Sequence, residues 1–161
     1  MHFYFIPFIG VQPYCYFAHP PETKPSDKVV IWSAVLDALG KIGDPKAKEL
    51  LTDSLSCSDF FVRAYAVNAL GNLGDKEATP ALKKLLNDQH YLVRVTAAVA
   101  LVKLQDSSAE ERLLALSIDQ DDAVRAEAVL HLGEFGPKFL ARLLKVLSEE
   151  KNAFVLAKAI E

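Results

Sequence analysis

Apolar residues recur at intervals of three and four along most of the chain, which is the spacing of one face of a helix. Between residues 62 and 73, for instance, Val62, Ala66 and Leu70 share one face, and a further apolar stripe follows over residues 78–86. Strict alternation of apolar and polar residues, which is typical of a half-buried strand, does not compete with this pattern. The hydrophobic pattern therefore predicts an all-α protein.

The helical pattern repeats with a period of 31 residues. Glycines mark the helix ends in three copies, because glycine readily adopts the positive φ that closes a helix. Asp44, Asp75 and Asp106 follow the helix ends and are expected to cap the next helix. Since one such hairpin cannot bury its apolar stripes alone, the copies are expected to stack into an α-solenoid. The four aligned copies are residues 38–44, 69–75, 100–106 and 131–137.

The period divides the chain into an N-terminal segment, residues 1–25, and a repeat domain, residues 26–161. The repeat domain holds about four and a half helical hairpins. The final half repeat has no second helix, and three interpretations of it stay open: a fragment of a longer array, a natural cap, or a dimer seam. The predicted repeats are about 28–57, 58–88, 89–119, 120–150 and the half repeat 151–161.

One copy reads Asp, Val-Arg, Ala, Ala-Leu-Gly and Ile-Gly-Asp, followed by a leucine-rich second helix. This pattern resembles the short HEAT-like repeats of the phycobilin-lyase type, and the resemblance extends from about residue 26 to residue 161. It implies a HEAT-like α-solenoid, an α-α superhelix. It implies less about activity, because one fold hosts many functions.

The resemblance also implies a ladder of arginine and aspartate side chains that ties the loops of neighbouring repeats together. Each arginine of the ladder lies four residues after an aspartate or, in one copy, after His90. Histidine in that place would make one rung depend on pH. The ladder residues expected on this basis are Asp59, Arg63, Arg94, Asp121 and Arg125.

Composition and charge narrow the classes of partner. The 161 residues are 51% hydrophobic and include 18 Lys and Arg against 21 Asp and Glu, a net charge of −3. A slightly acidic chain does not favour non-specific binding to nucleic acid or to an anionic membrane. Two cysteines are too few for a disulfide framework, so a reduced, cytoplasmic location is expected.

The first 20 residues differ from the rest, because they hold seven of the fifteen aromatic side chains and no Asp, Glu, Lys or Arg. Prolines and a glycine interrupt this stretch, which is atypical of a signal peptide or of a membrane span. Two interpretations stay open. The segment either folds over the open end of the array, against Trp32, or represents a mis-assigned start.

Catalytic and metal-ligating motifs are not evident in the sequence. The histidines and cysteines lack the short helical spacing that would let their side chains converge on one ion. None of the four histidines is followed by glutamate, the dipeptide that a HEAT-like iron enzyme, deoxyhypusine hydroxylase, places on its helices. These observations predict a protein that is not an enzyme and that binds no metal and no cofactor.

The predicted functional surface lies on the second helices, which in solenoids of this kind are expected to line the concave face. Its exposed columns have mixed charge, with an apolar patch flanked by basic residues, which suits an acidic, amphipathic peptide or helix. A rotation of the third repeat's second helix is equally consistent, since it would bury Leu114 and Ile118 and expose Arg112. The candidate partner-binding residues are Lys83, Lys84, Leu114, Ala115, Ile118, Arg142, Lys145 and Val146.

The predicted function is a non-catalytic scaffold that binds a peptide or helix of another protein on the concave face, without a membrane. Two alternatives stay open. One is a subunit of a chromophore (bilin) lyase, which the family resemblance suggests. The other is a HEAT-like nucleic-acid-binding protein, which would need a stripe of Lys and Arg along the groove. The mixed charge of the candidate surface disfavours nucleic acid.

Overall fold

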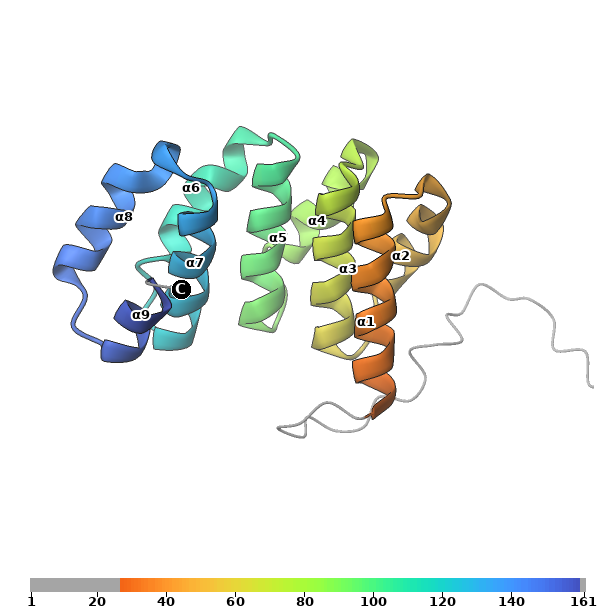
Figure 1. Cartoon of the computed structure of the whole chain (residues 1–161), viewed down its shortest axis with the longest axis horizontal. Coiled ribbons are helices and arrows are strands. Elements are labelled where there is room, and N and C mark those ends of the chain that lie inside the picture. Colours follow the sequence, from red (N-terminus) through yellow and green to blue (C-terminus); the bar gives the residue numbers. More distant parts are fainter. Residues whose placement is uncertain (1–26, 160–161) are drawn as a thin grey trace, which may run out of the picture.

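The computed structural model describes residues 27–159, and every regular element in this range is a helix (Figure 1). The predicted all-α solenoid is confirmed. The segment 1–25, with its proposed cap, lies outside the described residues. The first helices of the hairpins are α1 (Asp27–Ile42), α3 (Phe60–Leu73), α5 (Tyr91–Lys103), α7 (Asp122–Glu134) and α9 (Ala153–Lys158). The second helices are α2 (Lys48–Ser54), α4 (Thr79–Leu85), α6 (Ser107–Leu116) and α8 (Pro137–Glu149), with the 3₁₀ turns η1 (Pro45–Ala47) and η2 (Lys76–Ala78) before α2 and α4.

Aspartates cap the turns that lead into the second helices. Asp44, Asp75 and Asp106 each accept a hydrogen bond from the backbone N–H two residues ahead, at 2.9, 3.1 and 3.0 Å. This capping agrees with the sequence prediction, and it satisfies N–H groups that a helix start leaves without partners. Gly43 and Gly74, just before two of these aspartates, have φ of 74° and 72°. Local chemistry thus determines where each hairpin bends.

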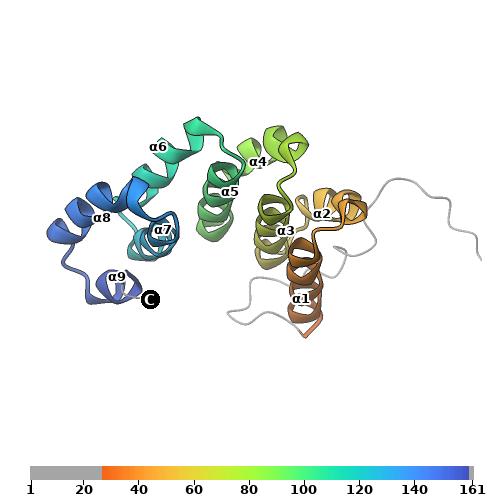
Figure 2. The same ribbon diagram turned by 45° about the horizontal axis from the view of Figure 1, so that its top comes forward.

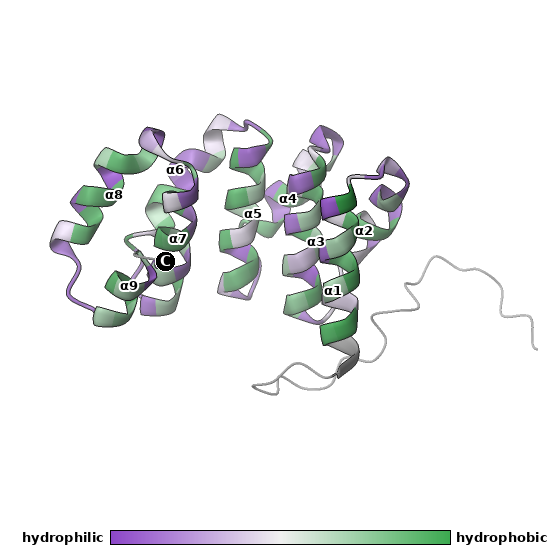
Figure 3. Ribbon diagram, viewed as in Figure 1, coloured by the Kyte–Doolittle hydropathy of each residue, from purple (hydrophilic) through white to green (hydrophobic). Residues whose placement is uncertain are grey.

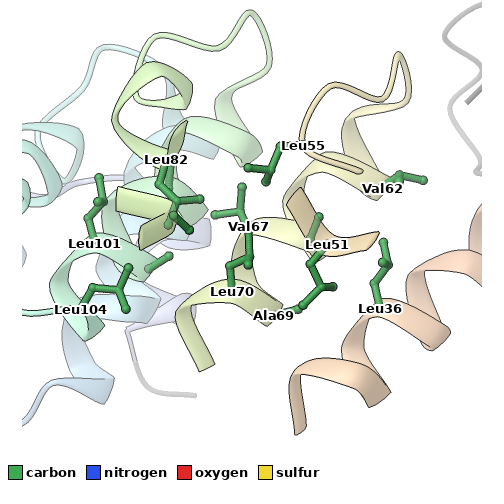
Figure 4. Close-up of a cluster of buried hydrophobic side chains, with 14 of the residues drawn as sticks. Leu36, Leu51, Leu55, Val62, Val67, Ala69, Leu70, Leu82, Leu101 and Leu104 are labelled. Atoms are coloured by element: carbon green, nitrogen blue, oxygen red, sulfur yellow. The ribbon is translucent and has the colours of Figure 1, made fainter. Parts of the chain in front are cut away.

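Leucine and alanine side chains fill the space between the first and second helices. Figure 4 shows this core around α3, with side chains that α1, α2, α4 and α5 contribute to it. Leu51, Leu82 and Leu113, which stand 31 residues apart in the sequence, are all 0% exposed. The periodic leucine column therefore forms the buried seam of the first three repeats.

The first helices pack directly against one another through glycine and alanine. A Cβ atom built on Gly40 would lie 2.6 Å from the Cα atom of Ala69, and one built on Gly71 would lie 2.8 Å from the Cβ atom of Ala100. Only glycine allows such a close approach of two helix backbones. Helix α3 consequently packs extensively against both α1 and α5.

The array curves toward its first helices. Figure 2 shows the odd-numbered helices along the inner side of an arch, with α2, α4, α6 and α8 along its outer side. Among the described residues, no two second helices pack extensively against each other. The prediction that the second helices line the concave face is therefore wrong. The close glycine–alanine contacts shorten the spacing of the first helices, so the row of second helices is the longer one and lies outside.

The pairing changes between α5 and α7. Gly40 and Ala69 stand 29 residues apart, as do Gly71 and Ala100, and the next pair of this series is Val102 and His131. Two larger side chains replace glycine and alanine there, and α5 packs much less extensively against α7 than against α3. The buried core divides at this point into two clusters. Figures 1 and 2 show α7 set further from α5 than α3 is.

The last hairpin departs from the 31-residue register. Leu144, which continues the column of Leu51 in the sequence, is 58% exposed, whereas Phe139 and Leu143 are buried. Helix α8 begins at Pro137 directly after Gly136, without the aspartate cap that precedes the other second helices. Its buried face is therefore shifted by one residue relative to the column. Figure 3 shows several strongly hydrophobic residues along α8.

Helix α9 packs on α7, where Val155 is fully buried and Phe154 is 54% exposed. A dimer through this half repeat stays a prediction, which the mass in solution tests. Within residues 27–159, no helix has the length and apolar character needed to cross a membrane.

Candidate functional site

The predicted partner-binding residues lie on the convex side, because all of them belong to or directly follow second helices. Leu114 and Val146 are half-buried and pack against the core, whereas Ile118 is 68% exposed. Arg112 is exposed and donates a hydrogen bond to the backbone oxygen of Leu86 at 3.2 Å. The arrangement of α6 thus combines the two interpretations: Leu114 and Arg112 sit as the rotation requires, while Ile118 faces solvent.

A shallow depression, here called the convex hollow, brings together two of the predicted residues, Ile118 and Val146. Its volume is about 440 Å³. Lys83 does not join it, since its ammonium group is paired with Asp106 at 2.6 Å. The other lining residues are polar or charged: Ser117, Asp119, Arg125, Glu149, Glu150 and Lys151.

The predicted ladder arginines hold the loops between repeats. Arg63 donates from Nη1 to the backbone oxygens of Cys57 and Ser58, both at 2.8 Å. Its Nε and Nη2 atoms donate to the two carboxylate oxygens of Asp88, at 2.9 and 2.8 Å. Arg94 donates to the backbone oxygens of Asp88 and Gln89 at 3.0 and 3.1 Å. Each arginine therefore fastens the loop before its own helix, and Arg63 also binds the loop of the next repeat.

Arg125 repeats this arrangement one period later. It donates to the backbone oxygens of Asp119 and Gln120, and its Nε donates to Glu150 at 2.7 Å. The hydrogen bond from Arg125, together with a backbone hydrogen bond from Asn152, lowers the pKa of Glu150 to about 2. Glu150 therefore remains charged throughout the neutral and mildly acidic range.

The acidic partners of the ladder differ from the prediction. Asp59 and Asp121 cap α3 and α7, accepting from the N–H groups of Phe61 and Ala123 at 2.8 and 2.9 Å. The side chains that pair with Arg63 and Arg125 are Asp88 and Glu150, each 25 residues after its arginine. An acidic column at residues 88, 119 and 150 was present in the sequence as a signal. Sequence reasoning missed it because it paired residues within one repeat.

His90 takes the capping position of Asp59 and Asp121, with Nδ1 accepting from the N–H of Leu92 at 3.3 Å. The imidazole also stacks on Phe60, with ring centroids 3.5 Å apart. Burial lowers the pKa of His90, and the nearby positive charge of Arg63 lowers it further. The folded protein thus holds this side chain in its neutral form, which the cap requires.

We expect His90 to make the protein less stable as the pH falls. A histidine whose pKa is lowered in the folded state contributes stability above its ordinary pKa of about 6.5, and this contribution decreases as the pH falls below that value. The variant His90→Asp restores the aspartate cap of the other repeats. Its free energy of unfolding, from urea titration, should rise relative to wild type between pH 7.5 and pH 5.5. A difference that stays constant with pH would contradict this role.

A second depression, here called the concave hollow, crosses three first helices on the inner side of the arch. Its volume is about 230 Å³. Helices α5 and α7 flank it at the place where Val102 and His131 replace the small pair found elsewhere. The lining residues are Phe61, Ala64, Tyr65 and Asn68 from α3, Leu92 and Thr96 from α5, and Glu127 and His131 from α7.

The polar side of the concave hollow is a histidine between two carboxylates. His131 Nε2 lies 3.4 Å from Glu127 Oε1, and Nδ1 lies 3.2 Å from Glu134 Oε1. Burial alone would lower the pKa of His131, but the hydrogen bond with Glu127 and the charges of both carboxylates outweigh it and raise the pKa. The sequence had suggested a packing role for His131, because alanine occupies this column in the other repeats.

The concave hollow joins an apolar surface to a few convergent polar groups, which is the composition of small-molecule sites. Sequence reasoning missed it, because its residues come from three repeats and from helices that were expected on the convex side. Among the described residues, no group of three or more His, Cys, Asp or Glu side chains could hold a metal ion.

Two family profiles match the chain. HEAT repeats match residues 55–122, and the PBS lyase HEAT-like repeat matches residues 33–57. Among curated proteins, none matches this sequence.

A solved structure is also similar: the complex of CpcE and CpcF of phycocyanin lyase from Nostoc sp. PCC7120, with a TM-score of 0.54 and 23% sequence identity. The match covers 88% of this chain and 65% of that chain, and it supports the solenoid fold.

These matches contradict the prediction that the chain is not an enzyme. One repeat is of the type named for PBS lyase, and the similar structure belongs to a phycocyanin lyase. The prediction rested on the lack of a catalytic motif, which is weak evidence for a repeat protein that shares its reaction with other chains. The matched repeats and the stacked helical hairpins agree with each other: the chain is a HEAT-like repeat protein that includes a PBS lyase HEAT-like repeat.

Proposed function

We propose that this protein is a subunit of a bilin lyase and holds an open-chain tetrapyrrole on the concave face of its first helices. The observation that carries the proposal is the concave hollow, where aromatic and aliphatic side chains face a carboxylate and a histidine. The PBS lyase repeat at residues 33–57 and the similarity to a phycocyanin lyase support it. The proposal replaces the scaffold without catalysis and makes the chain part of a lyase reaction.

The size of the concave hollow supports a shared site. Pockets that enclose a drug-sized ligand span about 300–1,000 Å³ and bury most of the ligand surface. A hollow of about 230 Å³ can enclose only part of a tetrapyrrole. We therefore propose that a second protein covers the remainder of the bilin, in agreement with the similar structure, which is a complex of two proteins.

The residues predicted to bind a partner keep that role as a proposal, now on the convex side. Ile118 is 68% exposed, and Leu140 and Leu144 on α8 are 50% and 58% exposed. Exposed apolar side chains in one region commonly mark a protein contact. Because they lie on the opposite side of the arch from the concave hollow, a protein bound there would leave the bilin surface open.

The proposal is tested by adding the full chain to biliverdin, an open-chain tetrapyrrole, and recording the visible absorption spectrum. A bilin held in a fixed conformation should show a shifted and strengthened long-wavelength band that saturates with protein. The same chain unfolded in guanidinium chloride is the control, and it should produce no shift. An unchanged spectrum at a large excess of native protein would overturn the proposed function.

A further inference from the structure

The concave hollow owes its position to a local change in helix packing. In the two preceding pairs of first helices, glycine and alanine bring the backbones together, so no comparable space can open between them. Val102 and His131 occupy the equivalent positions between α5 and α7, where packing is less extensive. The hollow is therefore a feature of one junction in the array and not of the repeat as such.

Resting on the proposed function, we infer that the concave hollow receives one pyrrole ring of the bilin, whose ring N–H donates a hydrogen bond to the Glu127 carboxylate. The side chain of Glu127 is 28% exposed and lines the hollow beside His131. An ionised carboxylate only accepts hydrogen bonds, and a pyrrole N–H is a donor, so the two groups are complementary. The hydrogen bond is charge-assisted, which makes it stronger than a neutral one.

The opposite side of the hollow suits the flat face of such a ring. Phe61 and Tyr65 come from α3, and Tyr65 is 39% exposed, so part of its ring is open to a ligand. Aromatic rings favour offset-stacked or edge-to-face contacts with other conjugated rings. Leu92 and Thr96 from α5 complete the wall between the aromatic side and Glu127.

Lys103 places a positive charge at the margin of the concave hollow. Its ammonium group donates to the side-chain oxygen of Asn72 at 2.9 Å and lies 3.4 Å from that of Asn68, which lines the hollow. Bilins carry propionate side chains, and a lysine ammonium is a suitable partner for such a carboxylate. Lys103 is exposed, so its contribution should be smaller than that of Glu127.

The test is a titration of biliverdin with the full chain, followed by absorption, for wild type and three variants. Glu127→Gln keeps the shape of the side chain and removes its charge, and it should weaken binding about tenfold. Lys103→Gln should weaken binding about threefold. Leu92→Trp fills the hollow and should abolish the spectral shift. Glu111→Gln, an exposed change on α6 at the convex side, is the matched control and should bind as wild type does.

The possible results separate the inference from the function on which it rests. Wild-type binding together with equal affinities for Glu127→Gln and Leu92→Trp would place the bilin elsewhere and overturn only the present inference. Failure of the wild-type chain to shift the spectrum would overturn both. Thermal unfolding of each variant distinguishes a lost contact from a lost fold, and the small surface change Lys103→Gln provides a test even if Leu92→Trp unfolds.

Discussion

Replacing Gly71 with valine should lower the free energy of unfolding by about 3 kcal/mol, because overpacking a tight contact forces backbone shifts. A Cβ atom at this position would lie 2.8 Å from the Cβ and 3.0 Å from the Cα of Ala100, and neither atom can rotate away. Helices α3 and α5 would have to separate, which would open the core on both sides of α3. Urea unfolding followed by circular dichroism measures the change.

Gly133 provides a matched control, because it occupies the same column as Gly40 and Gly71 but would have no neighbour within 4 Å of an added Cβ. In a helix, alanine is favoured over glycine by up to about 1 kcal/mol. Gly133→Ala should therefore stabilise the protein slightly, whereas Gly71→Ala should destabilise it. If both substitutions stabilised the protein to a similar degree, the close packing of α3 on α5 would be refuted.

Arg63→Ala should cost about 3 kcal/mol of stability, because removing one partner of a nearly buried ion pair leaves the other charge uncompensated. The side chains of Arg63 and Asp88 are 14% and 9% exposed. The variant would also free the backbone oxygens of Cys57 and Ser58. Since this arginine joins the loops of two successive repeats, the loss should reduce the cooperativity between them as well as the stability. Thermal and urea unfolding of the variant measure both quantities.

Two comparisons make the result of Arg63→Ala specific. Arg94→Ala removes hydrogen bonds to two backbone oxygens, and a loss of about 1 kcal/mol is expected. Lys84→Ala, an exposed change on α4, should alter stability by less than about 0.5 kcal/mol. An effect of Arg63→Ala no larger than that of Arg94→Ala would show that the pairing with Asp88 adds nothing to stability.

Much of the fold could be predicted from the sequence, because the signals involved are local. The spacing of Val62, Ala66 and Leu70 reports one helical face, and Asp44 and Asp75 cap the turns that follow the helix ends. Such patterns depend on residues a few positions apart, so the chain itself carries them. The prediction failed in α8, where the column of Leu51 points Leu144 to solvent. A periodic column transfers only if the turn before each helix has the same length.

The candidate site was less predictable, because it depends on distances between repeats. Asp88 pairs with Arg63 and Glu150 with Arg125 across 25 residues, and sequence reasoning paired the arginines instead with Asp59 and Asp121, which cap helices. The side of the array that becomes concave follows from the relative spacing of its two rows of helices. That spacing depends on contacts such as Gly71 on Ala100, which no single repeat contains.

By itself, the sequence determined that this protein is an array of helical hairpins with a 31-residue period and with its turns at fixed positions. It also contained the two substitutions, Val102 and His131, that distinguish one junction from the others. Only the tertiary structure decided that these two residues face one another, that the first helices line the concave side, and that a hollow opens beside them. The physical reason is that helix formation is set by neighbours in the chain, whereas curvature is set by how closely neighbouring repeats can approach.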